Sequence, residues 1–307
     1  MKKILFFLSL LFTINIAYGE NFLHKFLGGG PGSLAVDNSE GKDLSKFEKP
    51  NKCMDLYYWG QPKIKDENVL KRSLYFCYYK FASQYDTKLK VPLWTAELLN
   101  KKDLSIEPIK TNITFQENNE IPSTMQGTLA DYANTDLYPA QMAPNIDMVY
   151  NDNSLPLKIL KNDNKKIMSD SFLLTNTIPQ YKEVAPVWNS ISEYANLLGK
   201  ENDKIMVTSG PLYLNGKAIG FLGKSKIAVP PYFFKVITNP NNYGSVAYII
   251  PNSPNICQKG CNVNNFIVSI EEVEKLTGIS FYDLLSPYYA TQVKQDLTQM
   301  YKQQSHE

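Results

Sequence analysis

Histidine, the side chain most often used as a general acid or base near neutral pH, is nearly absent from this chain. The two histidines are His24 and His306, close to opposite ends of the 307 residues. Neither lies in the aromatic and apolar stretches between them, so we expect no histidine in the folded core. Ser209-Gly210 therefore has no histidine partner with which to form a nucleophile system.

Carboxylates offer a second route to acid–base chemistry. Asp131, Asp136 and Asp147 all fall in one stretch, DYANTDLYPAQMAPNIDM at 131–148. A carboxylate can act as a base, but loop aspartates more often stabilise turns and helix ends. The sequence leaves both interpretations open.

The first nineteen residues have the pattern of a cleaved export signal. Lys2 and Lys3 precede an apolar run, Ile4–Ala17, and Ala17-Tyr18-Gly19 supplies small residues for cleavage. The run is shorter than the roughly 20 residues of a membrane span, so a retained anchor is the less favoured alternative. We expect a signal peptide at 1–19 and an exported mature chain, periplasmic or secreted, without a membrane span.

Four cysteines in an exported chain indicate two disulfides. Their spacing favours the local pairs Cys53–Cys77 and Cys257–Cys261. A zinc site is the alternative, but only the second pair is close in sequence and no histidine is near it.

Charge argues against strong nucleic-acid binding. Without Lys2 and Lys3, the 32 basic residues become 30 and equal the 30 acidic ones, and Arg72 is the single arginine. A binder of nucleic acid normally carries a basic face and uses arginine on phosphates. The tyrosines Tyr57, Tyr58, Tyr75, Tyr78 and Tyr79 could stack on bases, although aromatic residues at strand spacing more often belong to a core.

The pattern of elements predicts a mixed α+β fold with a central, mostly antiparallel sheet flanked by helices. Residues 20–50, with a glycine cluster at 28–32, read as a flexible lead-in, and 51–307 as one domain. Apolar spacing predicts a helix over Val187–Leu198 that ends before Gly199. Further helices are expected at 270–276 and 287–303, and strands at 74–81, 204–208, 218–221, 233–237 and 245–250.

Five segments in register carry a family resemblance. They are 131–148 (above), SDSFLLTNTIPQ at 169–180, IMVTSGPLY at 205–213, KIAVPPYFFKVI at 226–237 and VSIEEVEKLTGISFYDLL at 268–285. In this order and spacing they resemble the DNA/RNA non-specific endonucleases, the sugar-non-specific branch of the ββα-metal (His-Me finger) nucleases. The resemblance runs from about Leu56 to Leu285. It implies phosphodiester hydrolysis in DNA and RNA with one magnesium ion.

The resemblance also implies a set of site residues. In the family, a histidine in an Asp-Arg-Gly-His motif activates water and the arginine acts on the phosphate. Met142-Ala143-Pro144-Asn145 follows the motif as it does in the family, which places the four motif positions at Tyr138, Pro139, Ala140 and Gln141. The base position is thus Gln141, an amide without useful basicity, and the arginine position is Pro139.

The metal positions also depart from the family. Asn176 matches an asparagine that shapes the family's site. The metal-holding asparagine falls on Ala185, or on Val184 if a one-residue gap is placed earlier, and neither side chain can bind magnesium. The family's glutamate falls on Ser192 or Glu193. Asn189 and Glu193 are one helical turn apart and could in principle hold an ion, although a solvated polar face is the simpler interpretation.

These replacements favour a pseudonuclease that keeps the fold and binds a ligand, either DNA or RNA weakly or an envelope protein. No cofactor is expected in that case. The first alternative is an active magnesium-dependent endonuclease that uses Asp136 or Asp147 as its base. The second is a structural envelope protein without nucleic-acid contact. A fold resemblance alone does not choose among them.

Overall fold

The computed structural model describes residues 53, 56–110, 112–154, 156–258 and 260–295. The expected signal peptide (1–19), the lead-in (20–50), both histidines and the last part of the expected 287–303 helix lie outside the described residues. Within the described residues, no helix combines the length and apolarity that crossing a bilayer requires.

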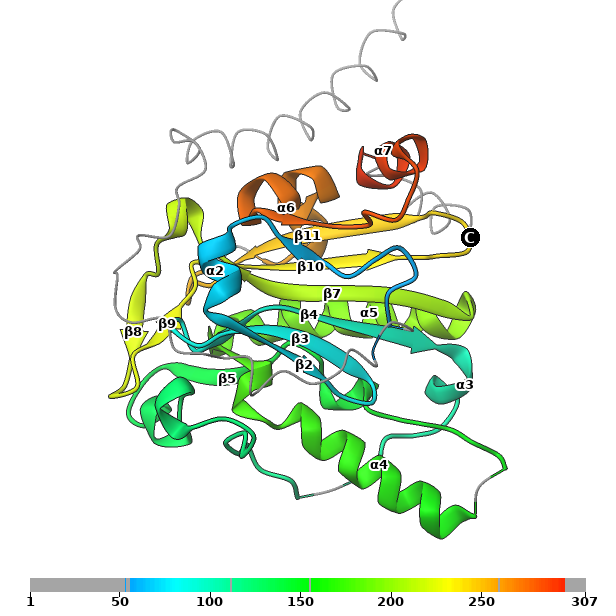
Figure 1. Cartoon of the computed structure of the whole chain (residues 1–307), viewed down its shortest axis with the longest axis horizontal. Coiled ribbons are helices and arrows are strands. Elements are labelled where there is room, and N and C mark those ends of the chain that lie inside the picture. Colours follow the sequence, from blue (N-terminus) through cyan, green and yellow to red (C-terminus); the bar gives the residue numbers. More distant parts are fainter. Residues whose placement is uncertain (1–52, 54–55, 111, 155, 259, 296–307) are drawn as a thin grey trace, which may run out of the picture.

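A seven-stranded sheet forms the centre of the fold (Figure 1). Every neighbouring pair of its strands is antiparallel, which confirms the fold class expected from the sequence. In spatial order the strands are β12 (Ile267–Val268), β11 (Ser245–Pro251), β10 (Tyr232–Thr238), β7 (Lys204–Leu212), β4 (Val91–Asn100), β3 (Phe81–Asp86) and β2 (Ser73–Cys77).

Helices pack around this sheet. Helix α5 (Ala185–Glu201) lies along β4 and β7, behind them in the view of Figure 1. Its apolar stripe, which includes Val187, Ile191 and Ala195, is buried, as the helical spacing predicts. The helices α6 (Ile270–Thr277) and α7 (Pro287–Gln295) pack together near β11. The short helices α2 (Glu67–Lys71) and α3 (Lys101–Leu104) flank the other strands.

A strand–strand–helix unit stands beside the main sheet. Strand β5 (Leu137–Gln141) pairs with β6 (Thr177–Tyr181), and α5 follows β6 almost at once. The long connection from β5 to β6 contains α4 (Leu157–Ser171). This unit carries the motif positions assigned above, with Gln141 at the end of β5 and Ala185 at the start of α5.

Smaller two-stranded pairs complete the fold. Strand β8 (Gly220–Leu222) pairs with β9 (Ile227–Val229) in a hairpin at the left edge of Figure 1. Strand β1 (Lys63–Ile64) pairs with β13 (Ile279–Ser280).

The structure corrects two expectations about elements. The run 74–81 is not one strand, because a turn at 78–80 divides it into β2 and β3. Helix α5 does not end before Gly199 but continues to Glu201. A Cβ atom at Gly199 would lie 2.8 Å from Leu104 Cδ1 and 3.1 Å from Leu99 Cβ, so this glycine allows close packing and does not mark the helix end.

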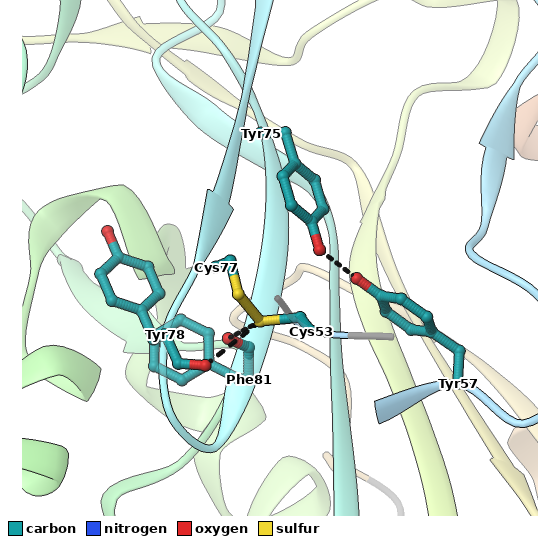
Figure 2. The surroundings of a disulfide bond; sticks show 6 residues. All are labelled: Cys53, Tyr57, Tyr75, Cys77, Tyr78 and Phe81. Carbon is teal, nitrogen blue, oxygen red and sulfur yellow. Dashed lines mark hydrogen bonds between the residues drawn. A yellow bond between two sulfur atoms is a disulfide. The ribbon is translucent and has the colours of Figure 1, made fainter. Parts of the chain in front are cut away.

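Both disulfides join the cysteines that lie nearest in sequence, Cys53 to Cys77 and Cys257 to Cys261. Figure 2 shows the first of them beside the hydrogen-bonded hydroxyls of Tyr57 and Tyr75. This bond ties the segment before β1 to the end of β2. It therefore restrains the edge strand of the central sheet.

Candidate functional site

Gln141 occupies the position that the resemblance gives to the general base. Its side-chain amide nitrogen and oxygen both form hydrogen bonds within the protein. Its Nε2 donates to the backbone oxygen of Ser171 at 2.9 Å and to the Ser171 hydroxyl at 3.1 Å. Its Oε1 accepts a hydrogen bond from the backbone nitrogen of Asn145 at 3.3 Å. The side chain thus joins the end of α4 to the turn that follows β5.

Asn176, which matches the site-shaping asparagine of the family, lies beside Gln141, and both side chains donate to the same Ser171 oxygen. The Asn176 Nδ2 also donates to the Ala143 oxygen at 2.9 Å, and its Oδ1 accepts from the Ala143 nitrogen at 3.1 Å. The side chain is buried. It holds two backbone segments together, which fits a role in shaping the site.

The other positions on β5 present no charge. The hydroxyl of Tyr138 donates to Gln180 Oε1 on β6, and burial raises the pKa of Tyr138 to about 12. Pro139 is buried and directly opposite Pro179 in the hairpin. A proline offers no hydrogen-bond donor and no cation. The arginine position therefore supplies nothing that could neutralise a phosphate.

The start of α5 offers no metal ligand at the two positions assigned to the metal-holding asparagine. Val184 is fully buried and Ala185 begins the helix. Asn189 and Glu193 are both exposed on the outer face of α5. Ser192 is instead buried, and its hydroxyl accepts a hydrogen bond from Lys235 Nζ at 3.1 Å.

A family model described as DNA/RNA non-specific endonuclease matches residues 64–287. The chain belongs to the DNA/RNA non-specific endonuclease family. The matched residues include the whole β5–β6–α5 unit.

Similar proteins of known identity are nucleases by name. Endonuclease G of Bos taurus is 26% identical over 266 residues, which cover 83% of this chain and 74% of that protein. Nuclease EXOG of Homo sapiens is 28% identical over 223 residues, which cover 67% of this chain but only 56% of that protein. Nuclease C1 of Cunninghamella echinulata var. echinulata is 28% identical over 221 residues, covering 67% and 81%.

One solved structure shows the same fold. A chain from the crystal structure of the EndoG/EndoGI complex superposes with a TM-score of 0.59 at 21% identity. The match covers 77% of this chain and 94% of that chain. At this identity the likeness concerns the fold alone.

The positions that the resemblance assigns to the metal ligand in this endonuclease-family member do not fit a magnesium ion. Magnesium prefers carboxylate, amide and water oxygens in octahedral geometry. The assigned ligand positions are Ala185 and Val184, and the Gln141 oxygen is turned to a backbone nitrogen. Within the described part of the chain, no group of three or more His, Cys, Asp or Glu side chains is placed to hold a metal.

Two of the three candidate carboxylates have structural partners. Asp131 accepts hydrogen bonds from the backbone nitrogens of Thr128 (2.8 Å) and Ser225 (3.0 Å). Burial raises the pKa of Asp131, but these hydrogen bonds outweigh it and lower the pKa to about 2. Asp147 is buried and accepts from Asn196 on α5. Asp136 is exposed before β5. A carboxylate with a pKa near 2 is a poor base at neutral pH.

A buried charged cluster under α5 escaped the sequence analysis. It consists of Glu97 on β4, Lys235 on β10 and Asp147, each at most 3% exposed. Lys235 Nζ also lies 4.2 Å from the centre of the Trp188 ring, whose Nε1 donates to the Gln141 oxygen. The cluster thus supports the helix and strand that carry the motif positions.

Burial sets the ionisation in this cluster. Burial, with Asp147 nearby, raises the pKa of Glu97 well above its usual range. Burial also raises the pKa of Asp147 to about 6, against the opposing effects of Asn196 and Lys235. Burial lowers the pKa of Lys235, against the opposing effect of the nearby Glu97 and Asp147 carboxyls. The sequences of β4 and β10 do not indicate this cluster, because a single charged residue in an otherwise apolar strand does not reveal which residue it contacts.

The tyrosines divide between core and surface. Tyr57 and Tyr75 both pack against the Trp94 ring, and Tyr78 packs against Phe81. Tyr58 and Tyr79 are 46% and 57% exposed, and Lys204 Nζ lies 5.3 Å from the Tyr58 ring. These five tyrosines therefore do not form one continuous stacking surface.

Proposed function

We propose that this member of the endonuclease family binds its ligand without hydrolysing phosphodiester bonds. The observation that carries the proposal is Gln141, a glutamine in the general-base position whose amide is engaged at both ends. An amide does not take up a proton near neutral pH. Gln141 acts instead as a link between the end of α4 and the Asn145 turn.

The remaining positions support the same proposal. Hydrolysis needs a base for the attacking water and positive charge on the phosphate and the leaving oxygen. Pro139 and Ala185 supply neither a cation nor a metal ligand. Loss of a general base alone commonly costs about 10²–10⁴-fold in rate. The combined losses are not additive, because these groups act as a unit.

Nucleic acid is the ligand class that the family implies. The near-zero charge of the mature chain and the proline in place of arginine predict weak, salt-sensitive binding. A gel-shift titration with duplex DNA and with RNA at low and physiological salt measures it. An envelope protein is the competing ligand, and binding to neither nucleic acid at low salt would favour it.

A nuclease assay tests the loss of catalysis. Purified mature protein is incubated with plasmid DNA and with RNA in magnesium, manganese or EDTA, beside a mock purification. We expect no cleavage above the mock sample. Gln141→His alone is expected to remain inactive, because it restores a base without a cation or a metal ligand. Magnesium-dependent cleavage that EDTA abolishes would contradict the proposal.

A combined variant extends this test. Tyr138→Asp, Pro139→Arg, Ala140→Gly, Gln141→His and Ala185→Asn together rebuild the family's positions. Recovery of trace cleavage by this variant, and not by Gln141→His, is the expected result. Circular dichroism checks that the rebuilt chain folds.

The second candidate is an active endonuclease with a carboxylate base. The names of its relatives favour it, and Asp136 is the candidate carboxylate that remains exposed. If the unmodified protein cleaves DNA, loss of cleavage in Asp136→Ala identifies that base. Asp147→Ala is the comparison, since Asp147 is buried and hydrogen-bonded to Asn196.

We also propose that the protein is exported. The signal pattern at 1–19 and the cysteine pairs, which suit an oxidising compartment, support this. The expected mature N-terminus is Glu20. Intact-mass measurement on protein from the native host checks it, and a mature form that retains Met1–Gly19 would contradict export.

A further inference from the structure

The β8–β9 hairpin is firmly held along its inner side. Leu222, Ile227 and Val229 are each at most 5% exposed. The Ala228 nitrogen donates to the Leu89 oxygen at 2.9 Å, which ties β9 to the loop before β4. The outward side chains of this hairpin are therefore presented on a fixed backbone.

The outward side chains consist of two apolar residues with lysines before and after them in the sequence. Ile219 and Phe221, two positions apart, are 54% and 61% exposed. Lys217 precedes them, and Lys224 and Lys226 follow at the turn; all three are exposed. We call these five residues the hairpin stripe. The hairpin lies at the edge of the molecule, on the opposite side from α7 (Figure 1).

Little negative charge opposes the stripe. The chain contains no Asp or Glu from 204 to 270. Asp131 contacts the hairpin, and both of its carboxylate oxygens accept hydrogen bonds, Oδ1 from the Ser225 nitrogen and Oδ2 from Thr128. The stripe is thus a positively charged surface with an exposed apolar centre.

We propose that the hairpin stripe docks the protein reversibly on an anionic lipid bilayer. Exposed apolar side chains surrounded by lysines match the headgroup boundary, where the rings and chains enter and the ammonium groups meet lipid phosphates. A nucleic-acid strand fits less well, because base stacking uses successive aromatic rings and Ile219 has none. This surface does not depend on chemistry at Gln141.

Vesicle sedimentation tests the apolar part. The full mature chain is mixed with vesicles of phosphatidylcholine alone, or with about 30 mol% phosphatidylglycerol to give an anionic surface. We expect sedimentation with the anionic vesicles only. Ile219→Ser with Phe221→Ser is expected to weaken binding about tenfold or more. The matched control is Leu284→Ser with Tyr288→Ser, whose side chains are 73% and 68% exposed elsewhere, and which is expected to bind normally.

Charge reversal tests the basic part. Lys224→Glu with Lys226→Glu is expected to abolish the preference for anionic vesicles, since each lysine near such a surface contributes about fivefold in affinity. Lys200→Glu, an exposed lysine on α5, is the control and should bind nearly as the unmodified chain does.

A fluorescence reporter keeps the test decisive if a serine variant fails to fold. The native Trp59, Trp94 and Trp188 are buried, so a tryptophan introduced as Phe221→Trp reports on the stripe. Its emission should shift to the blue with anionic vesicles, whereas Tyr288→Trp should not change. Unchanged emission of Phe221→Trp, or sedimentation that is equal for both vesicle types, would overturn the proposal. A shift caused by a single-stranded oligonucleotide and not by vesicles would assign the stripe to nucleic acid instead.

Discussion

Replacing Lys235 by methionine tests how the buried charged cluster supports the β5–α5 region. Methionine keeps most of the apolar stem but removes the cation. It deletes the 3.1 Å hydrogen bond to Ser192 Oγ and the contact at 4.2 Å with the Trp188 ring. It also removes one of the two lysines, Lys235 and Lys80, that favour the ionised form of the buried Asp147.

The expected cost follows from the lost attraction between Lys235 and the buried Asp147. Removing one partner of a buried charge pair typically costs about 3–5 kcal/mol. The Asp147 hydrogen bond to Asn196 remains, so we expect a loss at the lower end, about 3 kcal/mol at pH 8. This is a large part of the 5–15 kcal/mol that is typical of whole domains.

The cost should depend on pH. In the unmodified protein burial raises the folded-state pKa of Asp147 to about 6, above its unfolded value near 4. Its contribution to stability is therefore complete below about pH 4 and is lost as pH rises through about 6. Without Lys235 the folded-state pKa of Asp147 rises further. The loss of the Asp147 contribution to stability therefore extends to higher pH. The deficit of the variant should shrink to about 1 kcal/mol at pH 5, where Asp147 takes up a proton.

Urea unfolding between pH 5 and pH 8, followed by tryptophan fluorescence, measures these differences. Lys204→Met is the matched control, because Lys204 also contacts an aromatic ring but on a half-exposed surface; its expected cost is below about 1 kcal/mol. Adding Asp147→Asn to Lys235→Met should recover part of the stability at pH 8. Equal losses for Lys235→Met and Lys204→Met, or a deficit that does not change with pH, would refute the reasoning.

Three other outcomes follow from local structure. Cys53→Ser with Cys77→Ser should lower the free energy of unfolding by about 3 kcal/mol, and loss of the smaller Cys257–Cys261 ring should lower it by less. Peptide mapping without reductant that finds four free thiols would contradict the pairing. Asp131→Ala should cost about 1–2 kcal/mol at neutral pH through its lost hydrogen bonds, measured by urea unfolding. Because the folded pKa of Asp131 is lowered to about 2, its contribution should be present above about pH 4 and disappear as pH falls through 2; a loss that is the same at pH 2 and pH 7 would argue against this.

The elements with strong periodicity could be predicted from the sequence, and the others could not. The spacing of apolar residues in helix α5 indicates one buried face. The strands β7, β10 and β11 are apolar runs, and the structure buries them on both faces. Helix α4 contains many polar residues and was missed, as was the β5–β6 hairpin, in which Pro139 and Pro179 conceal a strand pattern. The division of 74–81 into β2 and β3 depends on a turn without glycine.

The assignment of the motif positions to Tyr138–Gln141 comes from the family resemblance and needs only the order, spacing and identity of residues. The hydrogen bonds of Gln141 could not be predicted from the sequence, because Ser171 is far from Gln141 in the chain. The two residues meet only when the chain returns from α4 to β6. The same reason separates the two roles of aspartate: the sequence places Asp131 and Asp147 in one stretch, but folding alone puts Asp131 against the β8–β9 hairpin and Asp147 beside Lys235. Local residue types determine which functional groups each position can supply, and long-range packing decides which polar groups meet and which apolar side chains stay in water.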